Sequence, residues 1–254
     1  MVNVFFYGEK AVLTAMVQAK TPERIKELMD RCREEGAEAF GMQFERLLPE
    51  YRNERVYREL FSYAGDLPVY YTNYRHTSNE GKSDEELAEE LVLFAKCGGQ
   101  LADVMGDYFH RTEGEMTDDA EAVKKQTELI ERLHTNGAKV LMSSHVLKFT
   151  PAEQVLEIAL EHKRRGADIS KIVTYANNTA EEMENLRIVT LLKEKLDIPF
   201  LFLAGGECRI LRRIGGELGC CTYLCVHEYD ELATQTQPLL KTVKAIRDNF
   251  GTFN

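Results

Sequence analysis

A lysine inside a predicted buried strand is the residue of this chain best suited to covalent chemistry. Lys171 lies in the run Asp168-Ile-Ser-Lys-Ile-Val-Thr-Tyr175, whose composition is typical of a strand buried on both faces. A charged amine is costly there unless it is paired, and burial favours the neutral amine, which is a nucleophile. Lys171 is therefore a candidate nucleophile. The alternative is a structural lysine at the strand entrance whose amine reaches solvent.

A histidine at the end of the preceding predicted strand is a candidate for proton transfer. His145 lies in Leu141-Met-Ser-Ser-His-Val-Leu-Lys-Phe-Thr-Pro151. Neighbouring strands would bring His145 near Lys171, and an imidazole exchanges protons readily near neutral pH. A histidine that only forms a hydrogen bond at a strand end is the alternative.

One short basic segment is a candidate anion site. It reads Glu207-Cys-Arg-Ile-Leu-Arg-Arg-Ile-Gly-Gly-Glu-Leu-Gly219 and contains Arg209, Arg212 and Arg213. An arginine can hold a carboxylate through two parallel hydrogen bonds. We predict this role for Arg213, whereas Arg209 and Arg212 are more typical of a solvated helix face.

These residues are positioned by a regular alternation of short apolar runs and longer amphipathic segments. We predict strands near residues 11–18, 38–46, 67–74, 101–108, 138–144, 169–175, 199–204 and 221–226. We predict helices near residues 21–36, 52–65, 83–98, 117–136, 151–165, 179–196, 208–218 and 238–249. Eight strand–helix pairs with a repeat of about 30 residues predict a single (β/α)₈ barrel domain over residues 1–254, a fold that typically needs about 250 residues.

The residues before about position 10 are left over by this repeat. We expect them to form a hairpin that closes the barrel bottom. A doubly wound open sheet is the competing fold. No G-x-G-x-x-G motif follows the first predicted strand, which weakens a dinucleotide-binding interpretation.

Several helix starts carry capping signals. Thr21 is expected to cap the first long helix, with Pro22 at its first helical position. Three pairs have capping-box spacing, namely Ser83 with Glu86, Thr150 with Glu153 and Thr179 with Glu182.

The composition is that of a globular protein, with 44% hydrophobic and 29% charged residues, which excludes disorder, collagen and coiled coil. The 32 basic and 42 acidic residues give a net charge of −10, which argues against general nucleic-acid or acidic-membrane binding. We find no signal peptide and no apolar run near the roughly 20 residues that span a bilayer. The six cysteines show no framework spacing, so we expect a cytoplasmic protein.

In a (β/α)₈ barrel, function resides at the carboxyl ends of the strands. Polar residues expected there, besides Lys171 within its strand, are Gln43, Glu45, Arg75, His76, Asp107, His110, His145, Glu207 and His227. Five of these form an alternative metal set without a paired motif, namely Glu45, Asp107, His110, Glu207 and His227. The Cys220, Cys221 and Cys225 group lacks the second half of a zinc site, and we interpret it as small core residues.

Three blocks of the sequence together resemble the type I 3-dehydroquinate dehydratase family. They are Ser144-His145 followed by Thr150-Pro151, then Gly166-Ala-Asp-Ile-Ser-Lys171-Ile, then Arg213-Ile-Gly-Gly-Glu217. The blocks occur in family order with nearly family spacing, and the chain length and repeat fit as well. The resemblance therefore spans almost the whole chain.

The resemblance implies specific roles. Lys171 matches the Schiff-base lysine, His145 the general acid/base, and Arg213 the arginine that binds the substrate carboxylate. Arg75 resembles the substrate-binding arginine after strand three, and Gln237 resembles the glutamine of the substrate-covering loop. The implied reaction is dehydration of 3-dehydroquinate to 3-dehydroshikimate, in the shikimate pathway of aromatic amino acid biosynthesis. The implied partners are a small anionic keto acid and a second copy of the chain in a homodimer, with no metal or organic cofactor.

The chain departs from the family where substrate hydroxyls are bound. The E-W-R pattern after strand two reads Gln43-Phe44-Glu45 here, although a one-residue slip would bring Glu45 and Arg46 into play. We expect Gln43 and Glu45 to decide which hydroxyl pattern is accepted, with Glu45 facing substrate hydroxyls or pairing with Arg75.

Two further family acids have no clear counterpart. The glutamate after the strand-three arginine has Asn79 and Glu80 as its nearest candidates, and the acid after strand four has Gly106 and Asp107. Two alternatives therefore stand beside the dehydratase. One is a Schiff-base enzyme of this fold, aldolases included, that acts on another polyhydroxy keto acid. The other is a catalytically silent barrel that only binds a ligand or partner.

Overall fold

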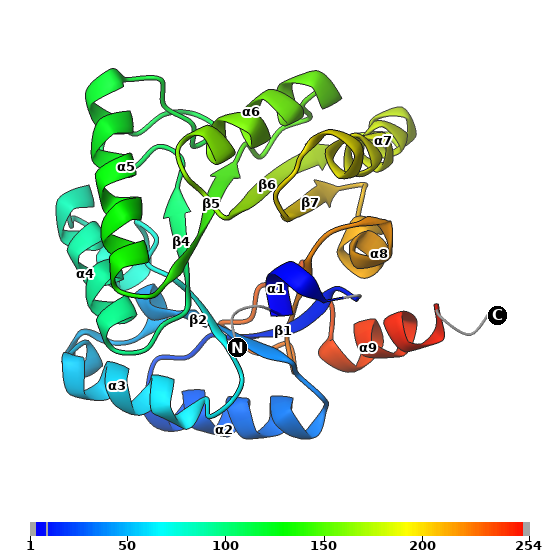
Figure 1. Ribbon diagram of the computed structural model, residues 1–254. Helices are drawn as coiled ribbons and strands as arrows, with labels where there is room; N and C mark the ends of the chain where they lie inside the picture. The colour runs from blue at the N-terminus through cyan, green and yellow to red at the C-terminus, as the bar shows by residue number, and fades with distance from the viewer. Residues whose placement is uncertain (1–3, 9, 251–254) are drawn as a thin grey trace.

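Eight parallel strands form a nearly closed barrel in the computed structural model, which describes residues 4–8 and 10–250 (Figure 1). The strands are β1 Val12–Val17, β2 Ala39–Gln43, β3 Val69–Thr72, β4 Leu101–Met105, β5 Lys139–His145, β6 Ile169–Ala176, β7 Phe200–Gly206 and β8 Thr222–Cys225. Their order is β7-β6-β5-β4-β3-β2-β1-β8. The parallel pairing of β1 with β8 confirms the barrel and rules out the doubly wound sheet.

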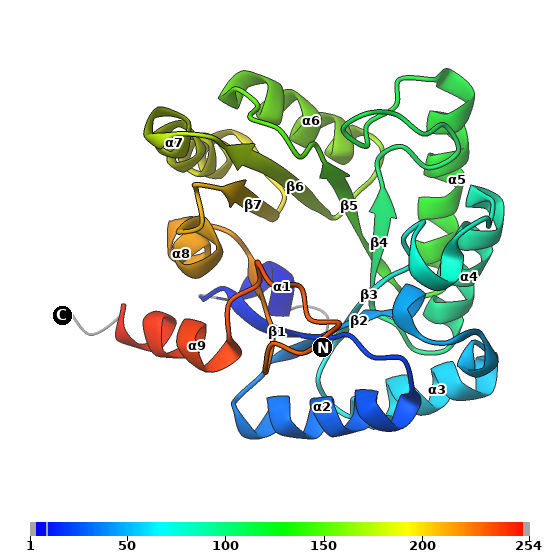
Figure 2. The ribbon, with the colours of Figure 1, turned by 180° about the vertical axis from the view of Figure 1, so that it is seen from behind.

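Helices surround the strands, as the view from behind shows (Figure 2). The long helices are α2 Pro22–Glu34, α3 Glu54–Tyr63, α4 Asp84–Lys96, α5 Ala120–Thr135, α6 Ala152–Arg164, α7 Thr179–Lys195, α8 Leu211–Leu218 and α9 Leu240–Asn249. All eight predicted helices are confirmed. Three short 3₁₀ turns, η1 Phe44–Arg46, η2 Pro49–Tyr51 and η3 Thr77–Asn79, follow β2 and β3.

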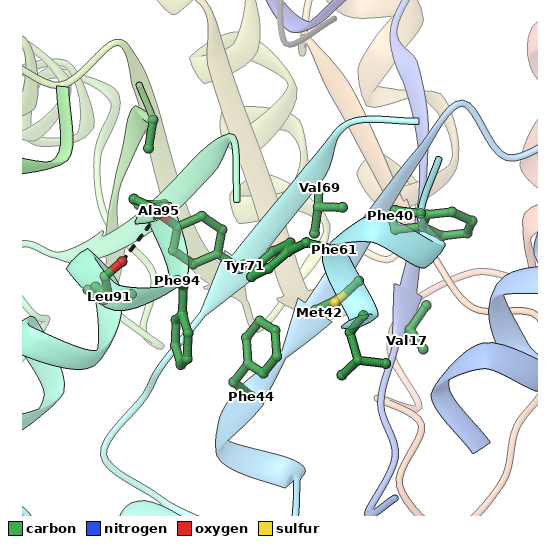
Figure 3. Close-up of a cluster of buried hydrophobic side chains, with 14 of the residues drawn as sticks. Val17, Phe40, Met42, Phe44, Phe61, Val69, Tyr71, Leu91, Phe94 and Ala95 are labelled. Atoms are coloured by element: carbon green, nitrogen blue, oxygen red, sulfur yellow. Dashed lines mark hydrogen bonds between the residues drawn. The ribbon is translucent and has the colours of Figure 1, made fainter. Parts of the chain in front are cut away.

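Strand alternation divides the core into two layers. Inside the barrel, Tyr70 and Leu101 belong to one buried cluster. Between the sheet and the helices, Tyr71 belongs to the other cluster, where Phe44 stacks on Phe94 with ring centroids 4.3 Å apart (Figure 3). Because successive strand residues face opposite sides, β3 sends Tyr70 toward the barrel interior and Tyr71 toward α4.

The sheet ends at β7 and β8, which share no strand ladder in the part of the chain described. They are joined at their beginnings, where the Cys221 N–H donates to the Phe200 carbonyl over 2.9 Å. Helix α8 packs against both strands. The unpaired edge of β7 leaves the Ala204 carbonyl free to accept a hydrogen bond from a side chain of α8.

The amino-terminal hairpin prediction is wrong, because the residues described there form a one-turn helix, α1 Val4–Tyr7. Phe5 of this helix is buried with Val12, Leu101 and Ile169, which lie at the beginnings of their strands. The helix therefore covers the barrel bottom near the centre of Figure 1. The Phe5 side chain fills that end of the barrel, where a hairpin was predicted.

The capping predictions hold in part. Thr21 accepts a hydrogen bond from the Arg24 N–H, and Ser83 with Glu86 forms a full capping box. The other two boxes are wrong because each helix is entered differently. Asn178 caps α7 one residue earlier than predicted, and Pro151 precedes α6 without a side-chain cap.

Strand β2 ends at Gln43, three residues before its predicted end, because Phe44–Arg46 turn into η1. This turn breaks the strand alternation on which the expected direction of Glu45 depended. No helix among the described residues is long and apolar enough to cross a membrane.

Candidate active site

A cavity of about 520 Å³ opens at the carboxyl ends of the strands. Lys171, His145, Gln43 and Gln237 line it, and so does Arg75. Five of the seven predicted site residues therefore share one cavity. The other two, Glu45 and Arg213, do not line it.

Lys171 is the third of the eight residues of β6, and 5% of its side chain is exposed. Its Nζ donates to Asp103 Oδ2 at 3.0 Å, to the Tyr70 hydroxyl at 3.0 Å and to the Tyr74 hydroxyl at 2.7 Å. The buried amine is therefore paired rather than extended to solvent, so the strand-entrance alternative is wrong. The amine reaches the cavity on a rigid strand.

Asp103 of β4 is the counter-ion of this lysine and has no exposed side-chain surface. Its carboxylate also accepts hydrogen bonds from Ser143 at 2.5 Å, from Tyr74 at 2.7 Å and from Tyr70. Burial alone would raise the pKa of Asp103, but the charge of Lys171 and these donors hold it below its ordinary value. Asp103 is therefore a carboxylate, and the cluster as a whole is neutral.

Burial and the Asp103 charge raise the pKa of both Tyr70 and Tyr74 well above that of an ordinary phenol. Both hydroxyls therefore stay protonated. Asp103, Tyr70 and Tyr74 were not among the predicted site residues, since a carboxylate and tyrosines near strands are common structural residues.

His145 ends β5, which pairs with β6 so that Ser143 lies opposite Lys171. His145 lies two residues after Ser143 on β5, so its side chain points to the same face of the sheet. It therefore lies one step beyond Lys171 in the direction of the cavity mouth. Its ring meets the Tyr74 ring edge-on, with centroids 5.5 Å apart. The expected proximity of His145 to the lysine follows from this register.

Glu115, which was not among the predicted site residues, holds His145. Its Oε2 accepts from the His145 backbone N–H at 3.1 Å and lies 2.6 Å from Nδ1.

Neither Asn79 nor Glu80 lines the cavity. The Asn79 side-chain amide instead donates to Asn73 and to the Tyr74 carbonyl.

The backbone of Glu115 is left-handed, with φ 52°, in the loop between β4 and α5. Such a conformation costs on the order of 1–3 kcal/mol and persists where surrounding contacts impose it. The Ser144 hydroxyl donates to the Glu115 carbonyl at 2.8 Å, and Arg165 donates to the Gly106 and Thr117 carbonyls on either side. No local pattern in the sequence signals this placement.

Arg75 lines the cavity, but its charge is already compensated. It holds both Asp84 oxygens at 2.8 Å and donates to Asp107 Oδ1 at 2.7 Å and to the Asp107 carbonyl at 2.9 Å. Four of its five N–H donors are therefore used within the protein. The expected pairing of Arg75 with Glu45 is wrong.

Of the two arginines of α8, Arg212 lines the cavity, whereas Arg213, for which the carboxylate role was predicted, does not. Arg212 Nε donates to the free Ala204 carbonyl of β7 at 3.1 Å, and it forms no ion pair with any described carboxylate. Arg213 is exposed and donates to the Arg209 carbonyl. Adjacent residues of a helix point about 100° apart, so a one-residue difference decides which arginine reaches the cavity.

Gln237 and Gln43 present amides to the cavity, whereas Glu45 does not. Gln237 is buried, and its Oε1 has no hydrogen-bond partner within residues 4–8 and 10–250. Gln43 Oε1 accepts from Gln18 at 2.8 Å. Glu45 turns away with η1, and its two carboxyl oxygens share the single O–H of Thr72, at 3.0 and 2.9 Å. Burial raises the pKa of Glu45 to about 7.

The alternative metal set is dispersed. His110 contacts the Thr117 hydroxyl, and His227 lies 3.0 Å from Glu35. No group of three potential ligands gathers anywhere in the described part of the chain. The six cysteines are free thiols.

The sequence profile of the type I 3-dehydroquinase family matches residues 13–248. The chain belongs to this family. Among curated relatives, a 3-dehydroquinate dehydratase of Alkaliphilus oremlandii is 37% identical over 92 residues, which are 35% of this chain and 36% of the relative. One from Listeria monocytogenes is 29% identical over 148 residues, 52% and 58% of the two chains. The chain therefore matches about a third to three fifths of the length of these relatives.

Solved dehydroquinases share the fold of this family member. The 3-dehydroquinate dehydratase of Geobacillus kaustophilus superposes with a TM-score of 0.81 at 15% identity, over 98% of this chain and 94% of the other. The type I enzyme of Clostridium difficile gives 0.78 at 16% identity, over 96% and 93%.

Proposed function

We propose that this dehydroquinase family member is a Schiff-base hydro-lyase that converts 3-dehydroquinate to 3-dehydroshikimate. The observation that carries the proposal is the buried Lys171 amine at the cavity floor, which is paired with Asp103. His145 lines the same cavity. The activity that relatives carry in their names supports the same reaction. The shikimate pathway is its proposed setting.

The chemistry proceeds through an imine. The neutral amine of Lys171 attacks the ketone, and water leaves to give an iminium ion. The iminium withdraws electrons and acidifies the neighbouring C–H, whose proton His145 removes. His145 then protonates the departing β-hydroxyl, and hydrolysis frees the enone and the lysine.

Arg212 and Gln237 are proposed to orient the substrate. Arg46, Arg111 and Arg212 line the cavity without a carboxylate partner among the described residues. Arg212 is the one that lies on α8, where the family resemblance places the carboxylate ligand, so we assign it the substrate carboxylate, held by charge-assisted hydrogen bonds. The unpartnered Oε1 of Gln237 can accept from a substrate hydroxyl, and the Gln43 amide can bind another. Arg75 lines the same cavity as Arg212, Gln237 and Gln43 and helps to set its shape.

The amine itself supplies the electron sink, so we propose that no metal or organic cofactor takes part. The free thiols support a reducing, cytoplasmic setting. A homodimer is proposed on the family resemblance.

A second candidate is a Schiff-base reaction on a keto acid with fewer hydroxyls. The apolar part of the cavity lining favours it, which includes Met16, Met105, Val173, Leu203 and Leu224. The absence of Glu45 from the cavity lining points the same way.

The test is enone formation from 3-dehydroquinate, followed by ultraviolet absorbance, with Lys171→Met as the inactive reference. We expect turnover by the native chain and none by the variant. Turnover of a less hydroxylated keto acid instead would select the second candidate. Equal, background rates for both proteins with every keto acid would contradict a lyase.

A further inference from the structure

The hydroxyl of Tyr74 lies between the reactive nitrogen and its counter-ion. It is 2.7 Å from Lys171 Nζ and 2.7 Å from Asp103 Oδ2, while Nζ and Oδ2 are 3.0 Å apart. The three groups form a closed triangle of hydrogen bonds at the cavity floor. Neither the family resemblance nor the proposed roles of Lys171 and His145 give Tyr74 a function.

We propose that Asp103 and Tyr74 form a proton relay that carries protons from the lysine nitrogen to the ketone oxygen during imine formation. This makes Tyr74 a further catalytic residue, and the inference rests on the proposed Schiff-base function. It separates two tasks, because His145 would then act only on the substrate carbon and the β-hydroxyl.

The proton balance of imine formation defines what such a relay must do. The lysine begins as an ammonium ion with three protons and ends as an iminium with one. The ketone oxygen must gain two protons to leave as water. Two protons therefore move from nitrogen to oxygen, and a group that touches the nitrogen must deliver them.

The relay satisfies this balance in two equal passes. Asp103 first takes a proton from the ammonium group, and the C–N bond forms while the C=O π bond breaks. The oxygen takes a proton from Tyr74, which recovers the proton held by Asp103. The carbinolamine nitrogen then gives its second proton to Asp103, and the same transfer releases the oxygen as water as the C=N bond forms. Asp103 and Tyr74 end unchanged, and Asp103 is left as the counter-ion of the iminium.

Tyr74 is better placed for this task than Tyr70. Tyr70 also contacts Nζ and Asp103, but it lies four residues earlier on β3, toward the closed bottom of the barrel. Tyr74 follows the end of β3 and lies on the side from which substrate enters, beside His145. The buried phenol resists ionisation, so it gives up a proton only as it receives one from Asp103.

His145 is unsuited to the same task because its Nδ1 is occupied by Glu115. Its remaining nitrogen, Nε2, is the one left for the substrate. No hydrogen bond or ion pair joins His145 to Asp103 or to Lys171 Nζ in the described residues.

Oxygen exchange isolates the proposed step. The probe is 3-oxocyclohexanecarboxylate, a keto carboxylate that can form an imine but has no β-hydroxyl to lose. In ¹⁸O-labelled water each cycle of imine formation and hydrolysis replaces its ketone oxygen, which mass spectrometry measures. We expect Tyr74→Phe to slow this exchange by about 10²-fold or more, the scale of general acid–base catalysis.

Tyr71→Phe is the matched control. Tyr71 is also a buried tyrosine of β3, but its hydroxyl points out of the barrel toward the Leu91 carbonyl, 3.5 Å away (Figure 3). Its loss should leave exchange within about 2-fold of the native rate. Asp103→Asn removes the other member of the relay and should also slow exchange by about 10²-fold or more. Thermal unfolding with and without the probe checks that each variant folds and binds.

The outcomes separate the two proposals. Native-rate exchange by a folded Tyr74→Phe or Asp103→Asn protein would overturn the relay and leave the Schiff base standing. A native chain with no exchange above buffer would overturn the Schiff base and the relay together. Slowing by Tyr71→Phe equal to that by Tyr74→Phe would assign the effect to packing and also overturn the relay.

Discussion

Glu115 and His145 are joined by two hydrogen bonds through one carboxylate oxygen, although 30 residues separate them. The oxygen holds both the backbone N–H and the ring Nδ1 of the histidine. Since a carboxylate only accepts hydrogen bonds, it fixes the tautomer that carries hydrogen on Nδ1 and leaves Nε2 facing the cavity. The loop between β4 and α5 therefore sets the orientation of a side chain on β5.

Removing this carboxylate should weaken proton transfer without preventing imine formation. For Glu115→Ala we expect kcat to fall about 10- to 100-fold, the scale seen for groups that orient histidine ligands, with KM little changed. Glu113→Ala is the matched control, because Glu113 lies on the same loop and pairs only with Lys148 at the surface. A larger effect of Glu113→Ala, or a change confined to KM, would contradict the orienting role.

Loss of the imidazole should separate the two halves of the reaction. For His145→Ala we expect turnover to fall by about 10² to 10⁴, while borohydride still traps an adduct on Lys171. The reason is that the lysine forms the imine and the histidine moves the later protons. An unchanged rate would transfer the acid/base role to another residue, such as His76, which also lines the cavity.

The two adjacent arginines of α8 form a natural pair of variants. Arg212→Ala should weaken binding of a substrate carboxylate by roughly 1.5–3 kcal/mol, the value of a charged hydrogen bond. Arg213→Ala should change affinity little, because Arg213 is exposed. Isothermal titration of both variants with the keto acid decides the assignment. The reverse ranking would restore Arg213 as the carboxylate ligand.

Regular patterns were sufficient to predict the barrel and the placement of Lys171 and His145 on neighbouring strands that line one cavity. Both residues lie on long strands, and parallel neighbours with a period of two place them on one face. Arg212 was expected on a solvated helix face, because the pattern does not fix which side of α8 faces the strands and α8 begins later than predicted. Glu115 was missed because a tertiary network, rather than any local preference, holds its left-handed backbone.

The buried Glu45 should make stability depend on pH in an unusual direction. Its folded pKa of about 7 lies above the ordinary 4.5, so the folded state binds its proton more tightly than the unfolded chain. The stability that this proton contributes is complete below pH 4.5 and is lost as pH rises through about 7. His76 Nε2 lies 4.0 Å from Glu45 Oε1, and the charge of Arg46 also acts on the carboxyl.

The native chain should therefore lose stability between pH 4 and pH 8, whereas Glu45→Gln should not. The difference between the two free energies of unfolding should change by on the order of 3 kcal/mol over this range, in favour of the variant at pH 8. Urea unfolding at both pH values measures this difference. Glu50→Gln, at an exposed neighbouring position, should show no such dependence. A native-minus-variant difference that is constant with pH would mean that folding does not raise the pKa of Glu45.

The most direct test of the central claim is reduction of the protein with borohydride in the presence of 3-dehydroquinate, followed by peptide mass mapping. The buried, paired amine of Lys171 predicts one covalent adduct, located on Lys171, and loss of activity in proportion to its formation. Lys163 is exposed in the helix that precedes β6 and serves as an internal reference that should stay unmodified. An adduct on a different lysine, or no adduct with any keto acid, would contradict the Schiff-base assignment.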